Sequence, residues 1–545
     1  MEMNKKPIQY NISFPNVWGG GQILAFSGID GTTDFENGLC FRTLHDGIGL
    51  ELMLPAGAKI VFGQGLPEKV VLTSDVIDIV VRTERVRGAF LDALHFLMEG
   101  ECTIVEKSEK IAVKQEKNIT LIGVEGFFVP SKIDAALNSV IASRLRWLNS
   151  LNVPSLFSSD ERRSFLKAAS IMKSQVCTPS GFIKHRWTTP DRWPHRRMWL
   201  WDSAYHAIGW RHLDIEIARE CIESVFDSQF EDGRISCTCG PDIRTEETQP
   251  PVLGTAVMAI DSVVPDVQWL KEMYMGLCRY VTWDIHNRSS VGGLLGWHTE
   301  KNSASCRCGE SGMDNSPRFD GHVPLNAVDF NSYAALECEN LCRIARKLGK
   351  NEDAVLWNKR YKHFSRSINQ RLWNEEIGIY MDCCAETGEQ TGVLSGAGFL
   401  PLICGASARY QAERLARHLK IPGYFATALP LATVSPRQPE FYSKDMWRGP
   451  AWVNLNWLIH KGFLRYGFEV ECKTIADKTL KEIERCYKKY GTFFEFYDDS
   501  AQVDPPDLLR KGKNEPGSSY NQVIHDYGWT AALYVDWKHH MLSMC

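Results

Sequence analysis

The sequence lacks the features that mark exported and membrane proteins. Two lysines near the amino terminus, in MEMNKKPIQY, are not followed by an apolar segment, so we predict no secretory signal. The chain also has no run of about 18 apolar residues, the length that a membrane-spanning helix needs. A large chain without an export signal favours thiols over a disulfide framework for its 17 cysteines. We therefore expect a cytoplasmic protein.

An excess of charge of one sign is also missing. The 62 basic and 66 acidic residues leave a net charge of −4. This balance is typical of a soluble globular protein and predicts neither a nucleic-acid partner nor binding to a membrane surface. At 545 residues, the chain is too long for one ordinary domain.

Several catalytic motifs are absent. No HExxH sequence occurs, which argues against a zincin, and no GxSxG sequence occurs, which argues against a nucleophile elbow. Two CxC pairs, Cys237/Cys239 and Cys306/Cys308, provide four thiols of the kind that bind zinc. Their one-residue spacing and their separation along the chain favour unliganded loop cysteines instead. We therefore expect no metal and no cofactor.

Tryptophan, by contrast, is plentiful. The chain has 17 tryptophans, and many fall in loops or at the starts of helical segments. Flat indole rings stack well on the apolar faces of ligands, sugar rings included. The other explanation is packing in the core or at its rim, which for any single tryptophan is the more frequent role.

The hydrophobic pattern changes once along the chain. Residues 1–130 contain β-branched runs separated by turn residues, and this pattern predicts an antiparallel β-sandwich. A helical piece at residues 88–100 is expected to interrupt its strands. Residues 131–545 instead show apolar residues at helical spacing. About twelve helices in pairs indicate a mainly α protein, with an (α/α)6 toroid as its second domain and long loops around one mouth.

Two acidic residues in the long loops suit general acid–base chemistry. Asp314 lies in ESGMDNSPRFD, where a stiff turn entered by glycine limits its rotation, and Glu495 lies among aromatic residues in GTFFEFYDD. Glycoside hydrolysis uses two such carboxyl groups, one protonated and one ionised. A turn-forming or helix-capping role for Asp314 and an exposed strand position for Glu495 are the alternatives.

Five stretches give the helical domain a resemblance to a known enzyme group. In chain order they are MWLWDSAYHAIGWRHLD, TQPPVLG, ESGMDNSPRFD, DMWRGPAWVNLNWLIHKG, and FFEFYD with the later YGWTAALYVD. The domain resembles the inverting α/α-toroid glycosidases and, within them, glycoside hydrolase family 63, which includes bacterial α-glucosidases and mannosylglycerate hydrolases. The resemblance implies an exo-acting inverting hydrolase that cleaves an α-glucosidic or α-mannosidic bond of a small saccharide or glycoside.

The same resemblance implies roles for individual residues. Asp314 would be the general acid and Glu495 the general base. The residues implied to form the sugar pocket are Trp201, Asp202, Gln249, Trp447, Arg448, Gly449 and Trp529. Ordinary packing of the tryptophans, and a structural ion pair for Asp202 and Arg448, are the alternatives.

Two features depart from the family pattern. The segment after Glu495, YDDSAQVDPPDLLRKGKNEPGSSY, is longer and more charged, and the CxC pairs lie beside Gln249 and Asp314. Both features fall where a leaving group would sit, so the sugar and its linkage stay open. A sugar phosphorylase, lyase or epimerase on the same toroid, and an inactive carbohydrate-binding protein, are the remaining alternatives. Phosphate-dependent turnover would identify a phosphorylase, and binding without release of a monosaccharide would identify an inactive protein.

Overall fold

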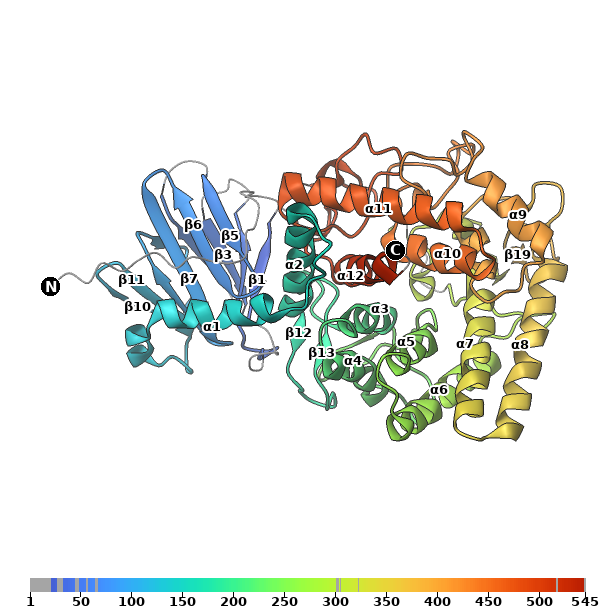
Figure 1. Ribbon diagram of the computed structural model, residues 1–545, viewed down its shortest axis with the longest axis horizontal. Helices are drawn as coiled ribbons and strands as arrows, with labels where there is room; N and C mark the ends of the chain where they lie inside the picture. Colours follow the sequence, from blue (N-terminus) through green and yellow to red (C-terminus); the bar gives the residue numbers. More distant parts are fainter. Residues whose placement is uncertain are drawn as a thin grey trace. The chain divides into compact units, whose positions relative to one another are not determined.

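The chain folds into two compact units (Figure 1). The first comprises residues 1–178, 191–193 and 484–493, and the second comprises residues 179–190, 194–483 and 494–545. The computed structural model describes residues 21–26, 33–44, 49–54, 57–63, 67–299, 303, 305–321, 323–515 and 518–543. The predicted boundary at residue 130 comes shortly after Val124, where the last strand of the two large sheets ends, and two further helices also belong to the first unit.

Two antiparallel sheets occupy the first unit, with strand orders β1-β2-β3-β4-β9 and β10-β11-β8-β7-β6-β5. The first sheet consists of β1 (Ile23–Ala25), β2 (Cys40–Thr43), β3 (Gly49–Leu54), β4 (Ala58–Val61) and β9 (Thr103–Val105). The second consists of β5 (Lys69–Leu72), β6 (Val76–Val81), β7 (Glu84–Asp92), β8 (His95–Glu99), β10 (Ile111–Glu116) and β11 (Ile119–Val124).

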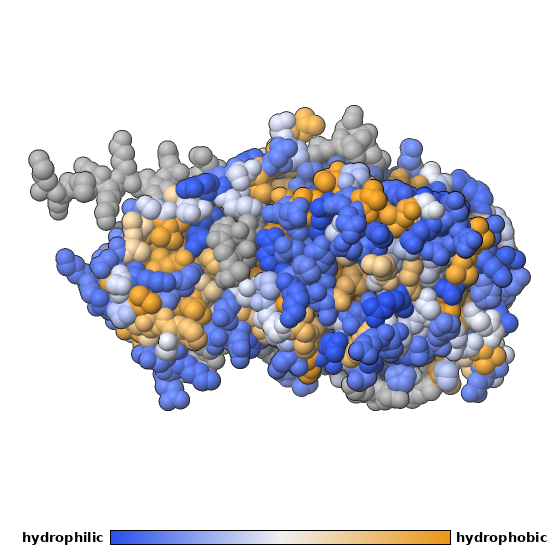
Figure 2. Space-filling model, turned by 90° about the horizontal axis from the view of Figure 1, so that it is seen from below, coloured by the Kyte–Doolittle hydropathy of each residue, from blue (hydrophilic) through white to orange (hydrophobic). Residues whose placement is uncertain are grey.

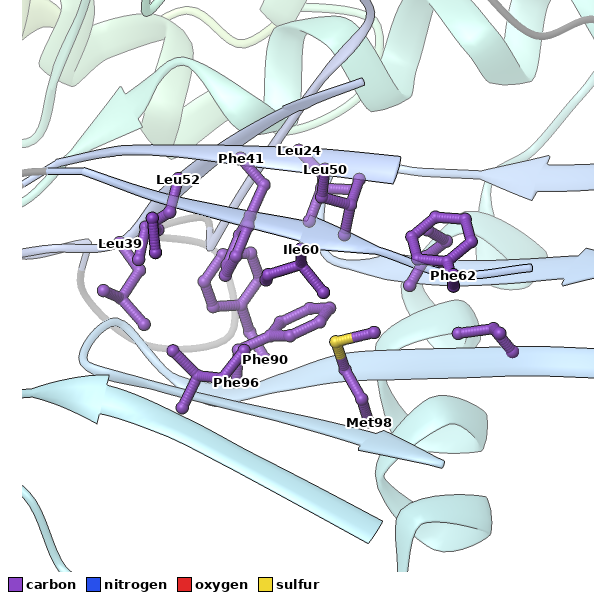
Figure 3. Packing of buried hydrophobic residues seen from close by; sticks show 14 of the residues in the cluster. Leu24, Leu39, Phe41, Leu50, Leu52, Ile60, Phe62, Phe90, Phe96 and Met98 are labelled. Atoms are coloured by element: carbon purple, nitrogen blue, oxygen red, sulfur yellow. The ribbon is translucent and has the colours of Figure 1, made fainter. Parts of the chain in front are cut away.

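The two sheets share one hydrophobic core (Figure 3). Leu50 and Leu52 on β3 are buried, and the residue between them is only partly buried, as expected for a strand with one face on a core. The ring of Phe41 on β2 lies 5.6 Å from that of Phe90 and 4.6 Å from that of Phe96, between centroids. These aromatic contacts join the two sheets, so the antiparallel sheets predicted for this region are present.

The prediction of a helix at residues 88–100 is wrong. These residues form most of the hairpin of β7 and β8, in which Phe90 pairs with Phe96. The Asp92 carboxylate accepts a hydrogen bond of 2.9 Å from the N–H of Leu94. A side chain that bonds the backbone two residues later favours a turn over a continuing helix.

Helices α1 (Leu137–Ser150) and α2 (Ser159–Ser174) complete the first unit. A capping box starts α2, because Ser158 and Glu161 each accept a hydrogen bond from the backbone of the other. Near the end of α2, Lys173 forms a fully buried ion pair of 2.8 Å with Asp75. This pair ties the helix to the turn before β6.

The second unit is mainly helical. Its α-helices are α3 (Leu200–Trp210), α4 (Ile215–Asp227), α5 (Leu253–Asp261), α6 (Val267–Asn287), α7 (Val328–Lys347), α8 (Asn351–Arg371), α9 (Arg409–His418), α10 (Val453–Arg465), most of α11 (Glu469–Tyr490) and α12 (Gly528–Ser543). A 3₁₀ helix, η4 (Gly396–Leu402), lies between α8 and α9 in the sequence.

Six of these elements follow one another in a closed series of contacts. Contacts run from α3 to α5, α7, η4, α10 and α12, and α12 returns to α3. A second layer packs on this series: α4 contacts α3 and α5, α6 contacts α5 and α7, and α8 runs beside α7 (Figure 1). Where the series closes, a Cβ added to Gly209 on α3 would lie 2.5 Å from the Cα of Ala532 on α12. Glycine therefore permits this close approach.

Hydrophilic residues cover most of the face of the molecule shown in Figure 2, and the hydrophobic residues on that face lie in scattered small areas between them. Such scattered apolar residues are usual on protein surfaces. Within the described ranges, no helix combines the length and the apolar character needed to cross a membrane.

Candidate active site

One cavity in the second unit collects residues from distant parts of the sequence. It holds about 540 Å³ of empty space, part of it open to solvent. The residues that line it are Pro190, His195, Trp199, Trp201, Asp202, Gln249, Gly312, Asp314, Met446, Trp447, Trp452, Glu495, Arg510, Lys511, Tyr527 and Trp529.

The starts of several helices of the closed series supply this wall. Trp201 and Asp202 lie in the first turn of α3, and Trp529 lies in the first turn of α12. Gln249 precedes α5 by four residues, and Trp447 precedes α10 by six. Because these helices pack side by side, segments far apart in the sequence meet at one end of them.

Indole rings form much of the wall. Trp201 meets Trp529 edge to face, with 5.2 Å between ring centroids, and Trp447 stacks on Trp452 at 3.7 Å. The Nε1 atoms of Trp447 and Trp529 are buried and find no acceptor among the described residues. These tryptophans therefore combine a packing role with apolar surface suited to the face of a sugar ring.

Asp314 sits on a turn that depends on the preceding glycine. Gly312 adopts a φ of 69°, and a Cβ there would collide with the indole of Trp201. The Asp314 carbonyl accepts hydrogen bonds from the N–H groups of Arg307, at 2.6 Å, and Cys308, at 3.1 Å. These contacts fix the backbone, while the side chain stays 23% exposed and lies 3.2 Å from the ammonium of Lys511.

Glu495 is held differently, by a buried arginine. Its two carboxylate oxygens accept hydrogen bonds from Nε and Nη2 of Arg510, at 2.7 and 3.1 Å, and both side chains are almost fully buried. Burial alone would lower the pKa of Arg510, but the Glu495 carboxylate outweighs burial and the pKa is raised. The prediction of an acid surrounded by aromatic residues omits this cation.

Asp202 and Gln249 occupy adjacent parts of the wall. Asp202 is buried in the first turn of α3. The side-chain oxygen of Gln249 accepts a hydrogen bond of 3.3 Å from the backbone N–H of Trp201. The backbone carbonyl of Gln249 accepts one of 2.8 Å from the Tyr280 hydroxyl. These contacts give the Gln249 side chain one orientation beside Trp201.

Arg448 and Gly449 do not line the cavity in the described structure, unlike the other residues predicted for it. The Arg448 guanidinium bonds both oxygens of Asp320, at 3.1 and 2.7 Å, and the carbonyl of Asn315 at 3.1 Å. Gly449 instead packs tightly on the carbonyl of Ser443. The resemblance implies that both residues form part of the sugar pocket, but in the structure they lie behind the residues that line it.

Three of the four cysteines in the CxC pairs lie in surroundings that raise the pKa of their thiols. Burial, with Asp314 and Asp202 nearby, raises the pKa of Cys237 well above its usual value, and burial raises the pKa of Cys239 to about 12. Burial also raises the pKa of Cys308. Thiols of this kind are poor metal ligands. Among the described residues, no group of three or more His, Cys, Asp or Glu side chains is placed to hold a metal ion.

A family comparison identifies the class of enzyme. Residues 194–530, more than half of the chain, match the mannosylglycerate hydrolase MGH1-like glycoside hydrolase domain family. The chain belongs to this family. It is therefore a glycoside hydrolase, and the matched region spans the cavity from His195 to Trp529.

Individual relatives agree with this membership. A mannosylglycerate hydrolase of Thermus thermophilus is 26% identical over 431 residues, which cover 64% of this chain and 96% of the relative. The mannosylglycerate hydrolase MGH1 of Selaginella moellendorffii is 24% identical over 393 residues, covering 57% of this chain and 77% of the relative.

Solved structures share the fold. A GH63 mannosylglycerate hydrolase from Thermus thermophilus, in complex with glucose, aligns over 68% of this chain and 99% of its own, with a TM-score of 0.56 and 24% identity. Neutral trehalase Nth1 of Saccharomyces cerevisiae aligns over 76% of this chain and 85% of its own, with a TM-score of 0.54 and 16% identity. At these identities the likeness establishes the fold and leaves the substrate to be determined.

Proposed function

We propose that the protein is an exo-acting, inverting α-glycosidase in which Asp314 is the general acid and Glu495 the general base. The observation that carries this proposal is that both carboxylates, 181 positions apart in the sequence, line one cavity walled by indole rings. The closed series from α3 to α12, with its second layer, supports an (α/α)6 toroid whose mouth holds this site.

The two carboxyl groups would act from opposite sides of the sugar. Asp314, in its acid form, donates a proton to the glycosidic oxygen as the bond from that oxygen to the anomeric carbon breaks. Glu495 accepts a proton from water as the water oxygen bonds to the same carbon from the other face, which inverts its configuration. Solvent then returns a proton to Asp314 and removes one from Glu495. Inversion requires the carboxyl groups to stand about 6.5–9.5 Å apart, so that water fits between them.

The partners of the two carboxyl groups are held in different ways. Arg510 fixes the orientation of the Glu495 carboxylate, and each carboxylate oxygen keeps a lone pair for water because a carboxylate has about four acceptor sites. Asp314 has a partly exposed partner instead: the Lys511 side chain is 29% exposed. Lys511 is therefore free to exchange this contact for a ligand.

The substrate we propose is an α-mannoside or α-glucoside with a negatively charged leaving group. Lys511 places an ammonium within 3.2 Å of the proposed acid, which is where the leaving group departs. Two of the relatives are named mannosylglycerate hydrolases, and glycerate carries a carboxylate that would pair with such a cation.

Two substitutions test the assignment of the acids. Asp314→Asn and Glu495→Gln should each lower kcat at least about 100-fold, because general acid or base catalysis contributes that much, while circular dichroism and the melting temperature stay near wild type. Glu515→Gln, at an exposed loop position, is the matched control and should retain full activity. Normal hydrolysis by either active-site variant would refute the assignment. Phosphate-dependent release of a sugar phosphate would support a phosphorylase instead.

A further inference from the structure

The segments that carry the proposed acid and base meet at one oxygen atom. Asn315, directly after Asp314, donates a hydrogen bond of 3.0 Å from Nδ2 to Oδ2 of Asp445. The N–H of Gly512 donates one of 3.0 Å to the same oxygen. Gly512 lies two residues after Arg510, which grips Glu495. An unbroken path therefore runs from the acid-bearing turn to the base.

This junction, which we call the Asp445 bridge, consists of Asn315, Asp445 and Gly512. Asn315 and Asp445 are buried, with 1% and 8% of their surfaces exposed. The other end of the Asn315 amide is also used, because its Oδ1 accepts a hydrogen bond of 3.0 Å from the N–H of Trp447. One amide side chain thus joins the acid turn to the segment that carries the cavity tryptophan.

Two residues beside the bridge adopt backbone conformations that are unfavourable for residues with a side chain. Met446, after Asp445, has a φ of 50°, and Lys511, before Gly512, has a φ of 56°. Both are side-chain-bearing residues in the left-handed region, and both line the cavity. Such conformations persist where surrounding contacts enforce them, and they cluster at functional sites. The bonds to Asp445 are contacts of this enforcing kind.

We propose that Asn315 and Asp445 are positioning residues that set the distance and angle between Asp314 and Glu495. The proposal rests on the proposed function, because it requires those two carboxyl groups to be the acid and the base. Neither bridge side chain lines the described cavity wall, so each acts through its neighbours. Breaking the bridge should slow the chemical step and leave substrate binding largely intact.

Because both hydrogen bonds end on one oxygen, the effect of the bridge can be separated from the effect of the Asp445 charge. Both donors converge on Oδ2 of Asp445, and the carbonyl oxygen of an asparagine at this position offers the same two acceptor sites. Asp445→Asn therefore preserves the bridge and removes the carboxylate charge. Asp445→Leu removes the acceptor at similar volume.

The first test compares these two variants with wild type on an α-mannoside of glycerate. Asp445→Leu should lower kcat about 100-fold, the size of effect expected from a misplacement of about 1 Å, with KM within about threefold of wild type. Asp445→Asn should recover kcat to within about fivefold of wild type. Asp261→Leu is the matched control, since it removes a buried aspartate at the far end of α5 and should keep full kcat.

The second test asks whether the two residues work through one connection. Asn315→Leu removes the donor instead of the acceptor, so it should reproduce the loss of kcat. This variant also replaces Asp445→Leu in the test if that variant does not fold. The double variant Asn315→Leu/Asp445→Leu should be no slower than the slower single variant, because effects through a shared contact are not additive.

Three results would overturn the bridge: wild-type kcat in both leucine variants, equal losses in Asp445→Asn and Asp445→Leu, or multiplicative losses in the double variant. A failure of the underlying function would look different. In that case Asp314→Asn and Glu495→Gln would themselves retain activity, whatever the bridge variants do.

Discussion

At the scale of single residues, the adjacent cations Arg510 and Lys511 contact the carboxylates of Glu495 and Asp314 in different ways. Arg510 bonds both oxygens of Glu495 and is almost fully buried, whereas Lys511 makes one contact of 3.2 Å to Asp314 and is 29% exposed. A planar guanidinium gives a rigid two-point grip, and a lysine ammonium is a mobile point charge. Arg510 is thus held in one place, and Lys511 is the cation that we propose binds an anionic leaving group.

Lys511→Met should therefore impair anionic substrates selectively. Loss of a hydrogen bond between charged groups costs about 1.5–3 kcal/mol. In steady-state kinetics, kcat/KM for the α-mannoside of glycerate, which carries a carboxylate, should therefore fall about 10- to 100-fold. The value for methyl α-mannoside, which has no anionic group, should change less than about threefold. Lys513→Met, at a position 58% exposed, is the control. Equal losses on the two substrates would contradict a role in recognising charge.

At the scale of elements, α3 contains a buried histidine that couples stability to pH. His206 lies on this helix, with Nδ1 2.8 Å from the hydroxyl of Thr188, and burial lowers its pKa to about 3. The unfolded chain takes up a proton at this residue near pH 6.5, but the folded chain does not until the pH is far lower. Stability must therefore fall as the pH drops from about 6.5 towards 3.

His206→Gln should flatten this dependence. The variant lacks the titrating group, so its free energy of unfolding should fall less steeply between pH 6.5 and 4, by up to about 1.4 kcal/mol per pH unit. Urea unfolding at several pH values measures the slope, with His363→Gln, at an exposed position on α8, as the control. A slope identical to wild type would contradict the argument.

The elements also show what the sequence can and cannot predict. Helical periodicity predicts amphipathic helices such as α4 and α8, because their buried residues recur at helical spacing. It fails at residues 88–100, where Asp92 starts a turn and the strands β7 and β8 pair. Asp498, three residues after Glu495, is fully buried and paired with Lys444. Long-range pairing of this kind leaves no local pattern.

At the scale of the whole molecule, the wall of the candidate active site includes residues beside the contact that closes the helical series. Gly209 on α3 meets Ala532 on α12, and the starts of these two helices carry Trp201, Asp202 and Trp529. A side chain at residue 209 would push the helices apart, and the cavity wall at their ends would move with them.

Gly209→Ala should therefore reduce stability and activity together. Alanine favours helix by up to about 1 kcal/mol over glycine, yet overpacking costs about 1–3 kcal/mol, so the net effect should be a lower melting temperature and a lower kcat. Gly321→Ala is the control, because a Cβ there meets open space. An unchanged or raised melting temperature in Gly209→Ala would contradict this view of the closure.

Only part of the site can be predicted from the sequence. Motifs identify Asp314 and Glu495 because each sits in a distinctive local setting, and seven of the nine predicted site residues line the cavity. Arg510 and Lys511 escape prediction as site residues because their segment follows no motif, although its unusual charge marks it as a departure. The sequence places Arg448 in the wall, and its pairing with Asp320 becomes visible only in the folded chain.

The most direct test of the proposed mechanism is the configuration of the sugar at the moment of release. Proton NMR during the first minutes of hydrolysis of an α-mannoside or α-glucoside distinguishes the two anomers before they interconvert. An acid and a base on opposite faces of the sugar predict that the β-anomer appears first. Initial release of the α-anomer would show retention and would contradict the roles given to Asp314 and Glu495.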